Sequence, residues 1–381
     1  MRILAAGGGS GGHVSPVAAL FNELAKQNTP VTAMFVCDKA FEAQSRGLME
    51  KVALPVDVRA IRSGKLRRYA HLSKLQHFAV PGLVWNNFKD IFKIGAGFFD
   101  SLALIYSFKP DVVFTKGGFV CLPVGMAAYV LRVPLVIHDS DTRPGLTNRV
   151  LAKWATVIAT GSPLTNYNYP ATKSHYIGVP ISPLFVPKSP TEQAAAKKSL
   201  GFKEGKLLVV AVGGGLGAES INAAMNRAAS AMLEQGIGAY VVAGKKHYEN
   251  ALKGAPDSGA YKVVPFVYEK MDQLLGAADI VVTRGSATFL QELAGLGKAS
   301  IIVPAHQLGD QIKNAKVFQD ANAALVVEND GIEHDDRLER AILTLADDPM
   351  LRKELGVRMH AFAKPRAAKS LARLIMTATK R

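Results

Sequence analysis

Two glycine-rich segments are the residues of this chain best suited to bind an anion. The first is Gly7-Gly8-Gly9-Ser10-Gly11-Gly12-His13, directly after an apolar run over 3–6. The second is Gly213-Gly214-Gly215-Leu216-Gly217-Ala218, directly after an apolar run over 207–212. A strand that turns through glycines into a helix presents backbone N–H groups and the positive end of the helix dipole. The pair therefore predicts two phosphate sites, on two Rossmann-like halves that face one cleft.

Three interpretations of these turns predict different chemistry. Glycine in a tight strand-to-helix turn permits positive φ and close packing without any ligand. Gly7-x-Gly9-x-x-Gly12, with Asp38 after the second predicted strand, also matches the dinucleotide-binding pattern of dehydrogenases. A nucleotide-sugar transferase would bind the donor diphosphate at one turn and use the other toward its acceptor. We favour the transferase, because a dehydrogenase has no use for the second turn.

His13 lies directly after the first turn, at the start of a predicted helix. A histidine in this position is suited to act as a general base or to contact an acceptor. An ordinary polar surface histidine fits the same pattern, so the residue is a candidate only in combination with the glycine turn.

The elements that position these residues alternate between strand-like and helix-like runs, which indicates an α/β protein with parallel sheets and crossover helices. Strands are predicted at 2–6, 31–36, 56–61, 111–114, 134–138, 156–159, 207–212, 239–243, 262–267, 279–283, 299–303 and 324–327. Helices are predicted at 14–27, 98–107, 122–131, 145–154, 219–235, 270–277, 287–297, 310–319 and 333–346.

The length of 381 residues predicts two or three domains. Residues 161–190 are rich in Gly, Pro, Ser and Asn and are predicted to form a hinge. We expect residues 1–160, together with a basic amphipathic helix in about 362–381, to form one Rossmann-like domain. Residues 191–361 are expected to form the other.

The formal net charge of +15 indicates an anionic partner. Nucleic acid is not expected, because no helix-turn-helix, zinc-ligand or RNA-recognition pattern is present. Two cysteines, Cys37 and Cys121, predict buried thiols in a reducing cytosol rather than a disulfide framework. No signal peptide or membrane span is expected, so contact with a membrane would be peripheral.

Several motifs together resemble one known family. They are Gly8-Gly9-Ser10-Gly11-Gly12-His13-Val14, Lys116-Gly117-Gly118-Phe119-Val120, His138-Asp139, Gly145-Leu146-Thr147-Asn148 and Arg284-Gly285-Ser286-Ala287. In their order they resemble the peptidoglycan GlcNAc transferases, the MurG family, which attach GlcNAc to undecaprenyl-diphospho-MurNAc-pentapeptide. The resemblance implies the GT-B fold, UDP-GlcNAc as donor, inversion of configuration and no metal or other cofactor. It also implies a peripheral location at the cytoplasmic face of the plasma membrane.

For the acceptor side, the resemblance implies that His13 is a catalytic or acceptor-binding residue. We expect the base to be His13, which follows the glycine turn, or Asp139, which ends a predicted strand of the same half. It implies that the acceptor is bound by Ser10, Gly11, Gly12, Lys116, Gly117, Gly118, Phe119, Asp141 and Asn148. Backbone amides of the second acceptor-side glycine loop would bind the acceptor diphosphate, with the Lys116 ammonium adding positive charge.

For the donor side, the resemblance implies that Glu292 accepts hydrogen bonds from both ribose hydroxyls. Arg284 and the following helix start would lie beneath the diphosphate, Gln311 would contact the GlcNAc hydroxyls, and Phe266 would lie near the uracil. The full donor set is Gly214, Gly215, Phe266, Arg284, Ser286, Ala287, Thr288, Phe289, Glu292, Asp310 and Gln311.

The sequence departs from the family pattern at several of these positions. Asp139 and Asp141 stand in a His-Asp-Ser-Asp segment where the family often has His-Glu-x-Asn. Gly215 replaces a serine, Ser182 an arginine and Asp310 a glutamine. The sugar and acceptor specificity therefore stay open. Asp139-Ser140-Asp141 also matches the D-x-D metal site of a different transferase architecture.

Residues 62–100 combine a basic segment without acids and a run of aromatic and apolar residues. This stretch predicts either a surface that docks on an anionic membrane or a core helix pair beside a solvated basic loop. Other functions that fit the chain are a GT-B relative with another acceptor, a UDP-GlcNAc epimerase and a non-catalytic nucleotide-sugar-binding protein.

Overall fold

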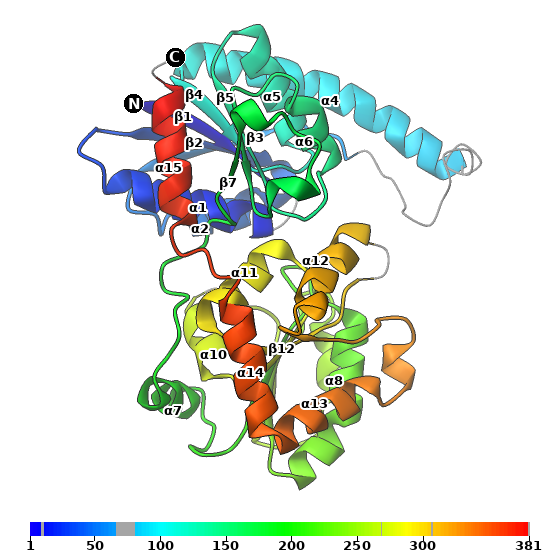
Figure 1. The fold of residues 1–381 in the computed structure, drawn as a ribbon. Helices are drawn as coiled ribbons and strands as arrows, with labels where there is room; N and C mark the ends of the chain where they lie inside the picture. The colour runs from blue at the N-terminus through cyan, green and yellow to red at the C-terminus, as the bar shows by residue number, and fades with distance from the viewer. Residues whose placement is uncertain (9–10, 66–80, 268, 306–307, 380–381) are drawn as a thin grey trace. The chain divides into compact units, whose positions relative to one another are not determined.

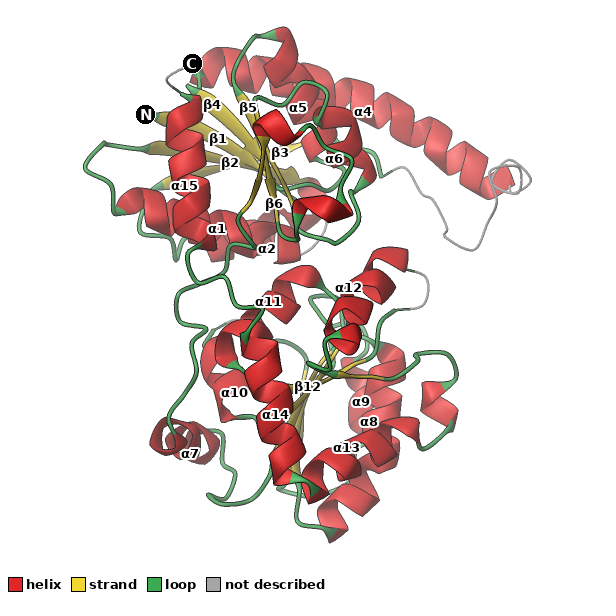
Figure 2. Cartoon of the chain, viewed as in Figure 1, coloured by secondary structure: helices red, strands yellow, loops and turns green. Residues whose placement is uncertain are grey.

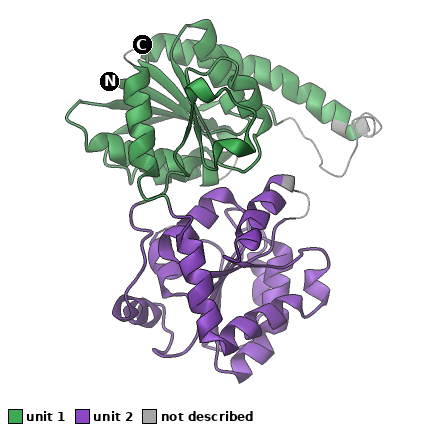
Figure 3. Ribbon diagram, viewed as in Figure 1, with its two compact units in different colours: residues 1–182, 364–381 green, residues 183–363 purple. Residues whose placement is uncertain are grey.

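The structure, a computed structural model, describes residues 1–8, 11–65, 81–267, 269–305 and 308–379 (Figure 1). It divides into two compact units, residues 1–182 with 364–381 and residues 183–363 (Figure 3). The division falls within the segment 161–190 that was predicted as a hinge. Residues 161–182 belong to the first unit and include an edge strand, which the sequence analysis did not predict.

The first unit is built on a seven-stranded parallel sheet with the order β3-β2-β1-β4-β5-β6-β7 (Figure 2). Its strands are β1 Arg2–Ala6, β2 Thr32–Asp38, β3 Val56–Ile61, β4 Val112–Thr115, β5 Leu135–Asp139, β6 Val157–Thr160 and β7 Ser174–Tyr176. Its helices are α1 Gly11–Ala25, η1 Lys39–Phe41, α2 Glu42–Met49, α4 Pro81–Phe108, α5 Cys121–Val130, α6 Leu146–Leu151, η2 Leu164–Asn166, η3 Ala171–Lys173 and α15 Ala367–Ala378.

The second unit is built on a six-stranded parallel sheet with the order β10-β9-β8-β11-β12-β13. Its strands are β8 Leu208–Val212, β9 Gly238–Val242, β10 Tyr261–Val264, β11 Ile280–Thr283, β12 Ala299–Ile302 and β13 Leu325–Val326. Its helices are α7 Pro190–Ser199, α8 Glu219–Glu234, α9 Tyr248–Lys253, α10 Met271–Ala277, α11 Ala287–Leu296, α12 Gly309–Asp320, η4 Ile332–His334, α13 Arg337–Asp347 and α14 Pro349–His360. The prediction of two Rossmann-like parallel sheets is confirmed.

The central strands are apolar on both faces because helices cover both sides of each sheet. In β1, Ile3 faces a cluster that includes Leu371 of α15, whereas Leu4 faces a cluster that includes Val124 of α5. Helix α15 also packs on α1, so the end of the chain returns to complete the first unit (Figures 1 and 3).

Both sheets reverse their strand order at the same kind of place, between β1 and β4 and between β8 and β11. The register pairs Ala6 with Thr115 and Val212 with Thr283. The first glycine turn, which begins at Gly7, therefore starts beside Lys116 after β4. The second, which begins at Gly213, starts beside Arg284 after β11. In open parallel sheets this is the edge at which ligands bind.

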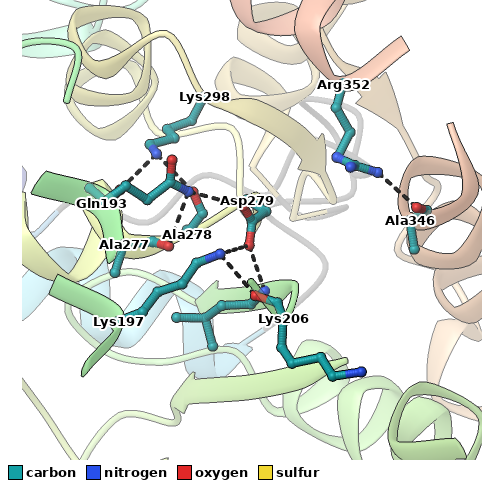
Figure 4. A network of polar contacts seen from close by, with 11 residues as sticks. Gln193, Lys197, Lys206, Ala277, Ala278, Asp279, Lys298, Ala346 and Arg352 are labelled. Carbon is teal, nitrogen blue, oxygen red and sulfur yellow. Dashed lines mark hydrogen bonds and ion pairs between the residues drawn. The ribbon is translucent and has the colours of Figure 1, made fainter. Parts of the chain in front are cut away.

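A buried polar network ties α7 to the opposite edge of the second sheet (Figure 4). The Lys197 Nζ lies 2.6 Å from the Asp279 carboxylate, which also accepts from the Leu208 N–H at 2.7 Å. The Gln193 amide donates to Asp279 Oδ1 at 3.0 Å, and Lys298 Nζ donates to the Ala278 carbonyl at 2.7 Å. The network positions α7 at the edge of the sheet opposite to the glycine turn of this unit.

Helix α4 is much longer than the predicted helix 98–107, because its charged residues and glycines interrupt the apolar run in sequence but not the helix. By length and composition alone, its stretch Val84–Phe108 could cross a membrane. Only its last part packs in the core, and Figure 1 shows the other end projecting from the first unit. The exposed apolar side chains are Val84, Trp85, Phe88, Ile91, Phe92, Phe99 and Tyr106.

Candidate active site

The predicted acceptor-side residues gather at the carboxyl edge of the first sheet. His13 lies in the first turn of α1, Lys116 follows β4, Asp139 ends β5, and Asn148 lies in α6. Ser10 lies outside the described residues, and α1 begins at Gly11 and continues through Gly12. Gly117, Gly118 and Phe119 form the turn between β4 and α5, and Asp141 lies two residues beyond β5.

His13 is held as a neutral imidazole against the second acceptor-side glycine loop. Burial and the nearby Lys116 ammonium lower the pKa of His13 to about 3, although a hydrogen bond with the Lys116 backbone opposes them. Within the described residues, the buried Nδ1 atom of His13 has no hydrogen-bond partner. A neutral ring with an unpaired nitrogen is the form that can accept a proton or a hydrogen bond.

Gly118 allows this close approach. Its φ is +87°, and a Cβ at this position would lie 3.4 Å from His13 Nε2 and 3.0 Å from the Gly8 carbonyl oxygen. Gly117 has a φ of +96° and lies against the Asn148 side chain. Both φ values favour glycine, and the absence of a side chain at these positions lets the Gly117-Gly118 loop approach the first glycine turn closely.

Lys116 is a buried cation at the centre of this edge. Its Nζ donates to Ser140 Oγ at 2.5 Å, and Ser140 Oγ lies 3.3 Å from His138 Nδ1. His138 Nε2 in turn contacts the Gly178 carbonyl oxygen at 2.9 Å. Burial lowers the pKa of Lys116, because its ammonium form is poorly solvated, and the charges of Asp141 and Asp139 oppose that shift. A bound anion would stabilise the ammonium form further.

Asp139 is buried, with 3% of its surface exposed. Its Oδ2 accepts hydrogen bonds from the Tyr169 hydroxyl at 2.8 Å and from the Gly145 N–H at 3.2 Å. Burial raises the pKa of Asp139 to about 7, and the Tyr169 hydrogen bond opposes that rise. The carboxyl group therefore titrates near neutral pH, as a general base requires.

The Asp139-Ser140-Asp141 segment, which matches a D-x-D metal site in sequence, uses its first carboxylate within the fold. Asp139 Oδ2 accepts hydrogen bonds from the Tyr169 hydroxyl and the Gly145 N–H. Among the residues that the structure describes, no group of three acidic, histidine or cysteine side chains could hold a metal ion.

The predicted donor-side residues gather at the carboxyl edge of the second sheet. Gly214 and Gly215 follow β8, Phe266 follows β10, and Arg284 follows β11. The remaining residues lie around or within α11 and at the start of α12; they are Ser286, Ala287, Thr288, Phe289, Glu292, Asp310 and Gln311.

Arg284 lies against the second glycine turn, in the position that Lys116 occupies beside the first. Gly214 has a φ of +84°, and a Cβ there would lie 3.1 Å from Arg284 Nη2. The buried Nε of Arg284 lacks a hydrogen-bond partner in the described part of the chain. Burial lowers the pKa of Arg284. Among the described residues, the Arg284 guanidinium therefore has a free N–H donor at Nε, next to the Gly214 backbone, where the glycine has no side chain to cover the main chain.

The start of α11 adds helix N–H groups to the same edge. Ser286 precedes the helix in an extended conformation, and its side chain makes no capping hydrogen bond there. Gly285 packs directly on the Gln311 backbone, and its carbonyl accepts from Asn314 Nδ2 at 2.9 Å. These contacts fix the start of α12 beside the start of α11. The Gln311 side chain accepts from the Ala305 N–H at 3.1 Å.

Glu292 lies one turn and a half into α11, and its carboxyl group is poorly solvated. Burial raises the pKa of Glu292 to about 8. No ion pair or hydrogen bond to this side chain is found over the described ranges. An acid that is buried without a cation is costly to the fold, which makes it a candidate for a ligand contact.

Sequence reasoning missed Ser140, Tyr167, Tyr169 and Gly178, which hold the acceptor-side residues in place. Tyr167 and Tyr169 lie in the segment assigned to the hinge, and no motif distinguishes them from other polar linker residues. Their importance follows only from the fold, which brings β6 and its following loop beside β5.

Comparisons with known proteins add an independent line of observation. Residues 3–160 match the glycosyltransferase family 28 N-terminal domain, and residues 208–371 match the glycosyltransferase family 28 C-terminal domain. A relative from Shouchella clausii is 33% identical over 334 residues, which cover 87% of this chain and 87% of that protein. A relative from Geobacillus thermodenitrificans is 32% identical and covers 88% of both chains. Both are named UDP-N-acetylglucosamine–N-acetylmuramyl-(pentapeptide) pyrophosphoryl-undecaprenol N-acetylglucosamine transferase.

Solved structures show the same fold at lower identity. The Acinetobacter baumannii MurG structure has a TM-score of 0.68 at 23% identity and covers 99% of both chains. The UDP-GlcNAc 2-epimerase of Neisseria meningitidis, bound to UDP-GlcNAc, has a TM-score of 0.66 at 12% identity, covering 99% of this chain and 100% of that one. The fold is thus shared by transferases and epimerases, so it does not distinguish them by itself.

Proposed function

The chain belongs to glycosyltransferase family 28, and on this premise we propose that it transfers GlcNAc from UDP-GlcNAc to undecaprenyl-diphospho-MurNAc-pentapeptide. One observation carries the proposal beyond the names of the relatives. Each unit places a poorly solvated cation, Lys116 or Arg284, beside a glycine turn at the point where the strand order reverses. Two such anion sites suit a reaction in which both donor and acceptor are diphosphates.

In this proposal the donor binds at the second unit. The diphosphate lies on the start of α11 and on the Arg284 guanidinium, which can donate two parallel hydrogen bonds. The Glu292 carboxylate accepts from the ribose hydroxyls, and Gln311 contacts the sugar. Arg284 and the helix N–H groups stabilise the charge that develops on UDP as it leaves, so no metal ion or other cofactor is required.

The acceptor binds at the first unit, with its diphosphate near Lys116 and the Gly117-Gly118 loop. The acceptor hydroxyl oxygen attacks the anomeric carbon of GlcNAc while the bond from that carbon to the UDP oxygen breaks. The hydroxyl proton passes to His13 or to Asp139, and the configuration at the anomeric carbon inverts. Asp139 is the better suited of the two, because its pKa of about 7 lies near the operating pH, whereas His13 is neutral but, with a pKa of about 3, only weakly basic.

A lipid-linked acceptor requires contact with a membrane surface, and α4 is the element suited to it. Its outer face carries exposed aromatic residues, and Lys89 lies 5.0 Å above the Trp85 ring. The acids of the helix are not available to repel anionic lipid: Asp90 is buried and Asp100 pairs with Arg62. We therefore infer peripheral docking of this face on the anionic cytoplasmic surface of the plasma membrane.

The docking proposal predicts that Phe92→Ser combined with Phe99→Ser weakens sedimentation with anionic liposomes. Met350→Ser is a matched control, because Met350 is equally exposed but lies in the second unit. UDP binding should be unchanged in all variants. Liposome binding that survives the double substitution would assign membrane contact to another surface.

The experiment that tests the proposed function is UDP release from UDP-GlcNAc with and without a soluble analogue of the lipid-diphosphate-MurNAc-pentapeptide acceptor. Release that requires the acceptor supports the transferase. An epimerase would instead convert the sugar in the absence of acceptor. Binding of UDP-GlcNAc with neither outcome would describe a non-catalytic binding protein.

A further inference from the structure

We propose that Tyr169 is a positioning residue of the acceptor site, because its hydroxyl holds the Asp139 carboxylate in place. This inference rests on the proposed function and deepens it. The tyrosine reaches the site from the loop after η2, and its hydroxyl donates to Asp139 Oδ2 at 2.8 Å. The Gly145 N–H donates to the same oxygen at 3.2 Å. Two donors from different segments thus define the direction of the carboxyl group.

Tyr169 is itself held by a second tyrosine. The Tyr167 and Tyr169 rings stack with centroids 5.4 Å apart and an interplanar angle of 10°. The Tyr167 hydroxyl donates to the Asp141 main-chain carbonyl at 2.6 Å and accepts from the Ser162 N–H at 3.3 Å. The two rings therefore anchor the same segment differently, Tyr167 through the main chain and Tyr169 through the carboxylate.

Because their hydroxyls have different partners, the two tyrosines can be used to distinguish an effect on the loop from an effect on the Asp139 carboxylate. Removing the Tyr167 hydroxyl affects the position of the loop, whereas removing the Tyr169 hydroxyl affects a group that titrates. The groups that act on Asp139 are few. Hydrogen bonds from Tyr169 and Asn148 and the charge of Lys116 favour its carboxylate form, and the charge of Asp141 opposes it together with burial. Burial and the charge of Asp139 raise the pKa of Tyr167.

Because the pKa of Asp139 lies near neutral pH, the loss of one hydrogen bond changes the fraction of Asp139 that is ionised. With a pKa of about 7, about half of the Asp139 side chains are ionised at neutral pH. Loss of one hydrogen bond to a carboxylate raises its pKa by about 1 unit. Tyr169→Phe should therefore reduce the ionised fraction at pH 7 about fivefold and leave it nearly complete at pH 9.

The test compares Tyr169→Phe with Tyr167→Phe, its matched control. We would measure kcat/KM for the acceptor analogue from pH 5.5 to 9 in the wild type and in both variants. In Tyr169→Phe the acid limb should move upward by about 1 pH unit, with activity restored at high pH and the KM for UDP-GlcNAc unchanged. In Tyr167→Phe the limb should keep its wild-type position. A Tyr169→Phe profile that is lowered equally at all pH values would overturn the proposal.

A second readout does not depend on turnover, so a failure of the proposed function can be told apart from a failure of this inference. The Tyr169 hydroxyl stabilises the carboxylate form of Asp139 only. The melting temperature of Tyr169→Phe should therefore fall increasingly below that of the wild type as the pH rises from 6 to 9. The gap for Tyr167→Phe should not change with pH. A constant gap for Tyr169→Phe would contradict the inference even if the enzyme proved inactive.

Discussion

Replacing Glu292 by Gln should make the protein more stable at alkaline pH while weakening the binding of UDP. The carboxyl group is half-buried without a cation, and burial raises its pKa from 4.5 to about 8. The folded state therefore binds the proton more tightly than the unfolded state. The associated destabilisation is absent below pH 4.5, grows as the pH rises, and is complete above pH 8.

The size of the effect follows from the two pKa values. At pH 7 the linkage reaches at most about 3 kcal/mol, and partial exposure reduces the expected gain for Glu292→Gln to about 1–2 kcal/mol. In a unit of this size that gain raises the melting temperature by about 4 °C. Loss of the carboxylate acceptor for the ribose hydroxyls should raise the Kd for UDP by about 10- to 100-fold.

Differential scanning fluorimetry at pH 5 and pH 8, with and without UDP, measures both effects. The gain in melting temperature should be present at pH 8 and nearly absent at pH 5. Glu249→Gln is the control, because Glu249 is an exposed acid of the same unit. A variant that is equally destabilised at both pH values would refute the burial argument. Unchanged stabilisation by UDP would remove Glu292 from the donor site.

Three further predictions concern the remaining site residues. Arg284→Ala should raise the Kd for UDP by at least about 10-fold in titration calorimetry. Arg284→Lys should raise the Kd less, because an ammonium keeps the charge but cannot donate two parallel hydrogen bonds. An unchanged Kd in Arg284→Ala would place the diphosphate elsewhere. The acid limb of kcat/KM should lie near pH 7 if Asp139 is the base, whereas a profile flat to pH 5 would favour His13, whose pKa is about 3; replacement of the base should lower turnover by about 10²-fold or more. Gly118→Ala should cost about 1–3 kcal/mol in urea unfolding, because its φ is +87° and its Cβ would press on Gly8. Gly47→Ala is the control: it lies within α2, where a Cβ meets open space, and should stabilise the protein by about 0.5–1 kcal/mol.

Much of the scaffold could be predicted from local patterns. The central strands read as short apolar runs because both of their faces are covered, and glycine turns after β1 and β8 predicted the edges at which ligands would bind. The helix α7 was missed although Ser189 and Glu192 form a capping box that signals its start. The edge strand β7 was missed because it is short and only its first residue is buried.

The parts of the site that depend on tertiary contacts could not be predicted in the same way. Spacing in sequence does not show that Tyr169 reaches Asp139 across 30 residues, or that His138 turns to the Gly178 carbonyl. Without those partners, the protonation states of the carboxylate and the imidazole cannot be inferred. The length of α4 was underestimated because charged residues and glycines interrupt its apolar run in sequence, although the helix continues through them with an exposed apolar face.

The most direct test of the proposed transfer is mass spectrometry of the acceptor analogue after incubation with the protein and UDP-GlcNAc, together with a count of UDP released. We predict that each acceptor gains one N-acetylhexosamine, that one UDP is released for each sugar transferred, and that the reaction proceeds in the presence of a metal chelator. An unmodified acceptor, with UDP-GlcNAc either consumed or epimerised, would contradict the proposed function.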